Sequence, residues 1–61
     1  MVEKCYILSS NEITLREVAK LISCIPCFID ARAMTGDLFE LYIKCRTEDV
    51  AAVERALAPY M

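Results

Sequence analysis

Apolar and polar residues follow two different periods along the chain, one typical of strands and one typical of helices. Cys5, Tyr6 and Ile7 favour extended backbone, and the turn-forming run 9–11 follows them, which predicts a strand over residues 3–8. Residues 27–33 and 38–46 alternate with a period of two around the short segment 35–37, which contains the only glycine. This pattern is typical of a β-hairpin, so we expect three strands in all.

Helical periodicity separates the first strand from the hairpin and returns after it. Thr14 and Glu17 have the spacing of a capping box, and apolar residues then recur on one helical face up to Pro26. We expect the first helix to start at Thr14 and to end at Pro26, because the residue before a proline is pushed out of the helical region. Thr47 is expected to cap a second helix, which Pro59 ends.

The predicted element order is β-α-β-β-α, in a single α+β domain over residues 1–61. A right-handed crossover through the first helix leaves room for the third strand between the first two. We therefore expect a three-stranded antiparallel sheet of order 1-3-2, with both helices on one face. This is the ferredoxin-like, or split β-α-β, plan without its usual last strand.

The alternation along each strand predicts which residues lie on the face without helices, called the open face below. A three-residue hairpin loop would place Arg32 opposite Glu40, an opposite-charge pair that supports this register. The open face then has an apolar centre and a charged rim, as protein interfaces do. The free edge of the first strand carries neither charge nor proline over residues 5–8, so it too needs a cover. The predicted interface residues are Tyr6, Leu8, Phe28, Arg32, Met34, Leu38, Glu40 and Tyr42.

Length and charge narrow the classes of partner. A chain of 61 residues builds only a small core, while 57% of its residues are hydrophobic, so we expect a second copy of the chain, in a dimer, to cover part of them. The net charge of −2 and the absence of basic runs argue against direct binding to nucleic acid. The longest uncharged stretch is far too short to span a membrane. A cytoplasmic location is expected, without a membrane partner.

Four cysteines are the chemically suggestive residues: Cys5, Cys24, Cys27 and Cys45. The fold plan gathers all four near one end of the domain, where thiolates hold zinc and a C-x-x-C pair exchanges disulfides. Parity places three of them, all except Cys24, on the core face, where cysteine is commonly an inert hydrophobe. We expect reduced, metal-free thiols and no cofactor. The chain has no histidine and no catalytic motif, so we do not expect an enzyme.

Segments 15–22, 29–33 and 41–54, with Thr35, Gly36 and Asp37 between them, resemble the RAM domain. This is the ACT-like effector module of Lrp/AsnC-type regulators, here in a stand-alone form without a DNA-binding helix-turn-helix. The resemblance implies association through sheet faces into dimers or rings, and an amino-acid-like ligand at Thr35, Gly36 and Asp37. Leu38 and Phe39 depart from the family's aromatic-acid pair, and its closing strand does not follow residues 60–61.

The leading hypothesis is a non-enzymatic, homo-oligomeric binding or regulatory module that associates through the open face and the first-strand edge and senses a small molecule. One alternative is a small inhibitor or adaptor that docks the same surfaces on a viral or host protein. A cysteine-based metal or redox protein is the third reading. The sequence does not separate the first two, because both use the same surface.

Overall fold

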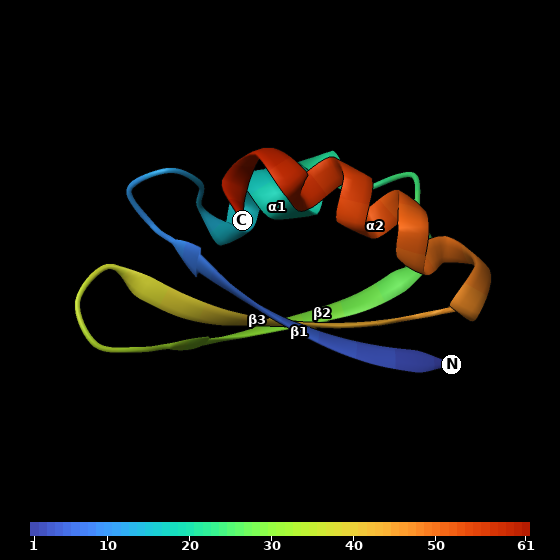
Figure 1. Cartoon of the computed structure of the whole chain (residues 1–61), viewed down its shortest axis with the longest axis horizontal. Helices are drawn as coiled ribbons and strands as arrows, with labels where there is room; N and C mark the ends of the chain where they lie inside the picture. Colours follow the sequence, from blue (N-terminus) through green and yellow to red (C-terminus); the bar gives the residue numbers. More distant parts are fainter.

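The computed structural model describes residues 1–61 and has the predicted order of strands and helices. Figure 1 shows α1 and α2 side by side above one face of the sheet, with nothing on the opposite face. The α+β fold class is thus confirmed. The elements are β1 (Val2–Ser9), α1 (Leu15–Leu21), β2 (Cys27–Ala33), β3 (Leu38–Cys45), the 3-10 turn η1 (Thr47–Asp49), α2 (Val50–Leu57) and the 3-10 turn η2 (Ala58–Tyr60).

The sheet has the predicted order β1-β3-β2, and both of its pairings are antiparallel. Arg32 lies opposite Glu40, so the hairpin register is the predicted one. Gly36 in the hairpin loop has φ of 70°, a left-handed conformation that residues with a side chain rarely adopt. The glycine therefore fixes the tight reversal between β2 and β3.

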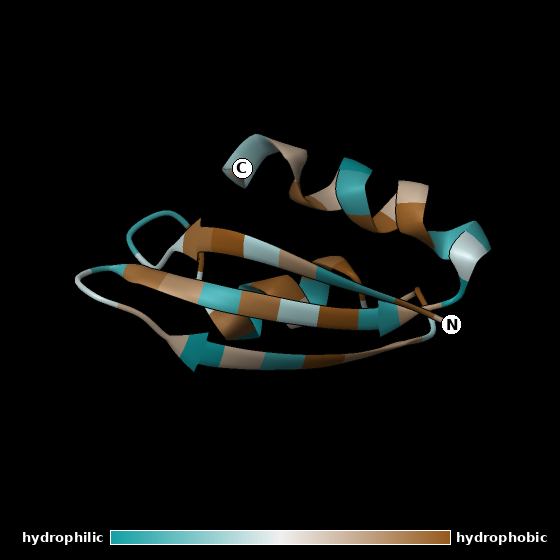
Figure 2. Ribbon diagram, turned by 60° about the horizontal axis from the view of Figure 1, so that its bottom comes forward, coloured by the Kyte–Doolittle hydropathy of each residue, from teal (hydrophilic) through white to brown (hydrophobic).

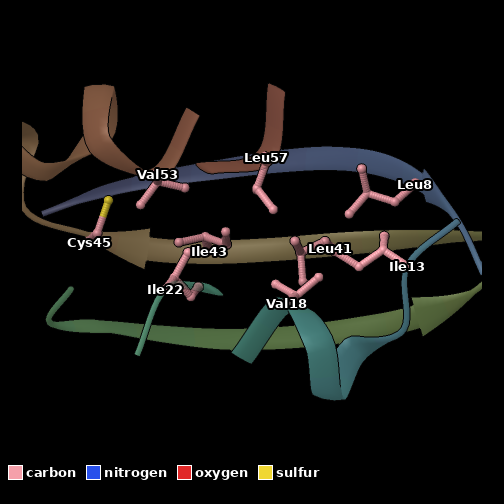
Figure 3. Close-up of a cluster of buried hydrophobic side chains, with 9 residues drawn as sticks. All are labelled: Leu8, Ile13, Val18, Ile22, Leu41, Ile43, Cys45, Val53 and Leu57. Atoms are coloured by element: carbon pink, nitrogen blue, oxygen red, sulfur yellow. The ribbon is translucent and has the colours of Figure 1, made fainter. Parts of the chain in front are cut away.

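Nine apolar side chains fill the space between the sheet and the helices (Figure 3). Leu41 and Ile43 on the central strand are fully buried and lie beneath side chains of both helices. Full burial of one such side chain contributes roughly 1.5–3 kcal/mol of hydrophobic free energy. The core is Leu8, Ile13, Val18, Ile22, Leu41, Ile43, Cys45, Val53 and Leu57.

Helix α1 begins as predicted but ends early. The Thr14 hydroxyl accepts a hydrogen bond from the backbone N–H of Glu17, and the Glu17 carboxylate accepts one from the backbone N–H of Thr14, so the capping box is complete. The predicted extension to Pro26 is wrong, because the helix stops at Leu21. The hydroxyl of Ser23 donates to the Lys20 carbonyl at 3.0 Å, a local bond that competes with further helical turns.

The start of α2 also differs from the prediction. Thr47 does not cap the helix but lies in η1, where no side-chain cap bond is made. Arg46 instead donates from Nε to the Asp49 carboxylate at 2.8 Å and lies 3.3 Å from the Glu48 carboxylate. The carboxylate of Asp49, and to a lesser extent that of Glu48, raises the pKa of the Arg46 guanidinium.

Neither helix has the length and apolar character needed to cross a bilayer.

Candidate functional site: the open face of the sheet

The register of the three strands fixes which side chains stand together on the open face. Buried residues of β3 are odd-numbered, so its even-numbered residues point away from the helices. Their neighbours on β1 and β2 follow from the pairing and form four rows across the sheet. The rows are Glu3-Lys44-Phe28, Cys5-Tyr42-Asp30, Ile7-Glu40-Arg32 and Ser9-Leu38.

Large apolar side chains on this face are exposed to solvent. Phe28 is 69% exposed, Ile7 55% and Leu38 45%. Met34, which follows β2, is 38% exposed and donates its backbone N–H to the Leu38 carbonyl at 2.9 Å. Single exposed apolar residues are common, but these four gather on one face of the sheet.

Glu40 forms the polar centre of the open face. Its carboxylate accepts a short hydrogen bond from the Tyr42 hydroxyl, and the Cys5 thiol lies 3.9 Å from the same oxygen. The hydrogen bond to Glu40 raises the pKa of Tyr42, because it holds the phenol in its protonated form. The Glu40 carboxylate keeps the Tyr42 phenol protonated, so this tyrosine is not an activated nucleophile.

A shallow hollow of about 330 Å³ lies at one end of the same face. Phe28 supplies apolar surface there, and Glu3, Asp30 and Lys44 supply charges of both signs. Ile29 and Tyr42 complete the lining. The hollow therefore combines charges of both signs with an exposed aromatic ring.

The predicted placement of Tyr6 and Leu8 on the open face is wrong. Leu8 is 1% exposed and belongs to the core. Tyr6 packs against the core, and its hydroxyl donates to the Glu54 carboxylate on α2 at 3.3 Å. Desolvation first, and then Glu54, raise the pKa of Tyr6 to about 12. The open-face residues of β1 are instead the odd-numbered ones, Glu3, Cys5, Ile7 and Ser9.

This inversion has a physical reason in the sequence of β1. Ile7 and Leu8 are adjacent apolar residues, so alternation alone does not assign a face to either. No tight turn links β1 to β3, and therefore no loop length fixes their register. The face of each β1 residue follows from its pairing with β3. The hairpin already assigns the odd-numbered residues of β3 to the core face, and Leu8 lies opposite one of them, Phe39.

The hairpin loop predicted as a ligand site has a structural role. The Asp37 carboxylate accepts a hydrogen bond from the Asn11 side-chain amide at 2.7 Å. Its backbone carbonyl accepts another from the Ser10 N–H, also at 2.7 Å. These two bonds tie the hairpin loop to the loop between β1 and α1. Thr35 and Gly36 line none of the hollows.

The four cysteines are free thiols and do not converge as predicted. Cys45 is buried and lies opposite Cys27 in the sheet. Cys5 is exposed in the middle of β1 opposite Tyr42, and Cys24 is exposed after α1. The predicted core placement of Cys5 is wrong, and no group of three metal-ligating side chains forms. Burial raises the pKa of Cys27, which disfavours the thiolate that disulfide exchange requires.

No protein-family model, curated protein or solved structure matches this chain.

Proposed function

We propose that this chain is a non-enzymatic binding module that associates with a second copy of itself through the open face of the sheet. The observation that carries the proposal is the exposure of Ile7, Phe28 and Leu38 on one face that no helix covers. Burying such side chains against a partner contributes hydrophobic free energy that the small core does not supply.

A second copy suits this face because its charges are mixed. Acidic Glu3, Asp30 and Glu40 alternate with basic Arg32 and Lys44 across the rows. Two copies therefore do not meet as surfaces of like charge, which would be costly. The resemblance to RAM domains supports the same mode of association, and the four free thiols favour a reducing compartment such as the cytoplasm.

The test is a pair of lysine substitutions at similarly exposed apolar residues. Ile7→Lys changes the open face, whereas Leu21→Lys changes α1, where Leu21 is 44% exposed. We expect sedimentation at micromolar concentration to give an oligomer for the wild type and for Leu21→Lys. Ile7→Lys should lower the mass, because the buried charge of a lysine is not compensated in the contact.

Equal masses for the two variants would contradict the open face as the contact. A wild type that stays monomeric at high concentration, but gains mass with a foreign protein, would favour the inhibitor or adaptor reading. In that case Ile7→Lys should abolish the foreign complex as well, since the same exposed side chains would carry it.

A further inference from the structure

The hydrogen-bonding direction of β2 shows which of its backbone groups are free. In an antiparallel strand the N–H and C=O of one residue point to the same side, and those of the next residue point to the other. Met34, next to β2, donates to Leu38 on β3. The backbone N–H and C=O groups of the even-numbered residues of β2 therefore point toward β3. Those of Ile29, Ala31 and Ala33 point outward, away from the sheet. Figure 2 shows no strand beyond β2 on that side.

We propose that a second copy of the chain docks on this free edge, with the two β2 strands antiparallel and a two-fold axis at Ala31. Ala31 then pairs with the partner's Ala31, and Ile29 pairs with the partner's Ala33. All of these residues direct their N–H and C=O outward, so a continuous ladder of backbone hydrogen bonds can form. The two copies would share one sheet of six strands.

Charge selects this register over its neighbours. With the axis at Ala31, Asp30 lies opposite the partner's Arg32, and symmetry repeats this opposite-charge pair. Shifting the axis to Asp30 would place two aspartates face to face, and shifting it to Arg32 would do the same for two arginines. Like charges directly opposite each other destabilise strand pairing. The edge of β2 is therefore self-complementary in only one of these registers.

The helix side of the same edge is apolar and incompletely covered. A hollow of about 250 Å³ lies beside Ala31, Ala33 and Leu15, and Leu15 is 41% exposed. A second hollow of about 160 Å³ lies beside Cys27 and Ile29. The proposed register places Ala33 of one copy next to the partner's Ile29, so the two kinds of hollow meet across the axis. Docking would close both to water.

A hydrogen bond between Ala31 and Asp30 has to break before a second strand can dock on this edge. The Ala31 N–H donates to the Asp30 carboxylate at 2.9 Å, which protects the edge of the isolated chain. Docking transfers this N–H to the partner's Ala31 carbonyl and transfers the Asp30 carboxylate to the partner's Arg32. Both groups remain satisfied, so the exchange needs a matching edge and would not occur against an arbitrary strand.

The edge of β1 lacks this self-recognition. The backbone N–H and C=O groups of Glu3, Cys5 and Ile7 point outward there, since those of the even-numbered residues of β1 point toward β3. The only charged side chains on the strand are Glu3 and Lys4, which stand on opposite faces. No antiparallel pairing of β1 with itself places opposite charges side by side. We therefore assign the edge contact to β2.

The first test is a proline at the outward edge, which removes a donor and blocks a neighbouring strand. Ala31→Pro is suited to this, because its N–H makes no bond to β3 and proline is tolerated on edge strands. Cys5→Pro is the matched control on the edge of β1. We expect Ala31→Pro to halve the mass of the wild-type assembly in sedimentation, and Cys5→Pro to leave the β2 contact intact. An unchanged mass for Ala31→Pro, with folding verified by circular dichroism, would overturn the proposal.

The second test keeps the backbone and reverses the charges. Asp30→Arg and Arg32→Asp each place like charges opposite each other in a homodimer, so we expect self-association roughly tenfold weaker for each. An equimolar mixture of the two restores both pairs, and native mass spectrometry should show the mixed dimer in excess. Absence of the mixed dimer would overturn the proposed register even if Ala31→Pro failed to fold.

The two proposed contacts are separable by the same measurements. If both exist, the wild type is larger than a dimer, and Ile7→Lys and Ala31→Pro each halve its mass. If only the edge contact exists, Ile7→Lys has no effect and Ala31→Pro gives a monomer. If only the open face contacts a partner, the result is reversed and the edge proposal fails.

Discussion

Tyr6 joins β1 to α2 through one side chain. Its ring packs against the core and its hydroxyl donates to Glu54, so the neutral phenol is favoured over the phenolate. Burial and the Glu54 carboxylate both act in this direction and raise the pKa of Tyr6 to about 12. A tyrosine first assigned to a contact surface is thus a structural residue between two layers.

Folding stability should depend on this tyrosine at high pH. Because the folded pKa lies above the ordinary value near 10, the contribution of Tyr6 to stability is complete below about pH 10 and is lost as the pH rises to about 12. We expect Tyr6→Phe to remove the latest tyrosine transition from an ultraviolet absorbance titration. Glu54→Gln should lower the pKa of Tyr6 but leave it above the ordinary value, since desolvation of the phenol remains. If Tyr6→Phe instead removes an ordinary transition near pH 10 and the latest transition remains, the Tyr6 phenol is not shielded.

Single residues also show where sequence reasoning is sufficient and where it is not. Phe28, Glu40 and Tyr42 were placed correctly because the hairpin loop fixes the parity of β2 relative to β3. Leu8 was predicted on the wrong face because no tight turn fixes the register of β1 relative to β3. The open face was therefore predicted on two of its three strands.

At the scale of elements, local chemistry predicted the helix start better than the helix end. The Thr14 and Glu17 capping box is a contact within one turn, so its spacing in the sequence suffices to predict it. The end of α1 depends on the Ser23 hydroxyl, which can donate to the backbone or to water. Periodicity alone extended the helix to Pro26 because Ile22 and Ile25 both contact the core, one from the helix cap and one from the turn beyond it.

The cap should matter more for α1 than for a long helix, because α1 has only seven residues. We expect Thr14→Ala to lower the free energy of unfolding by about 1 kcal/mol, since it leaves the backbone N–H of Glu17 without its side-chain partner. Thr14→Ser keeps a hydroxyl at the same position and should lose much less. Urea denaturation of the three proteins measures the difference, and equal losses for both variants would show that the cap bond is unimportant.

At the scale of the whole molecule, the structure is a thin two-layer domain with one covered and one uncovered face. Only nine of the 61 residues are buried, and all nine are apolar. Such a core provides modest stability, so binding to another chain would contribute a large share of the free energy of folding. The open face leaves apolar side chains without a partner, and the edges of β1 and β2 leave backbone groups without one.

The central position of β3 has a consequence for the order in which the chain folds. The β2-β3 hairpin closes over a short loop around Gly36, whereas β1 reaches β3 only after α1, β2 and the hairpin loop have been looped out. Loop-closure entropy therefore favours the hairpin as the earlier structure and β1 as the last strand to add. In amide hydrogen exchange, the Tyr6 N–H should exchange faster than the Asp30 N–H, although both point toward β3. Equal protection would instead mean that β1 and the hairpin open only together, as one cooperative unit.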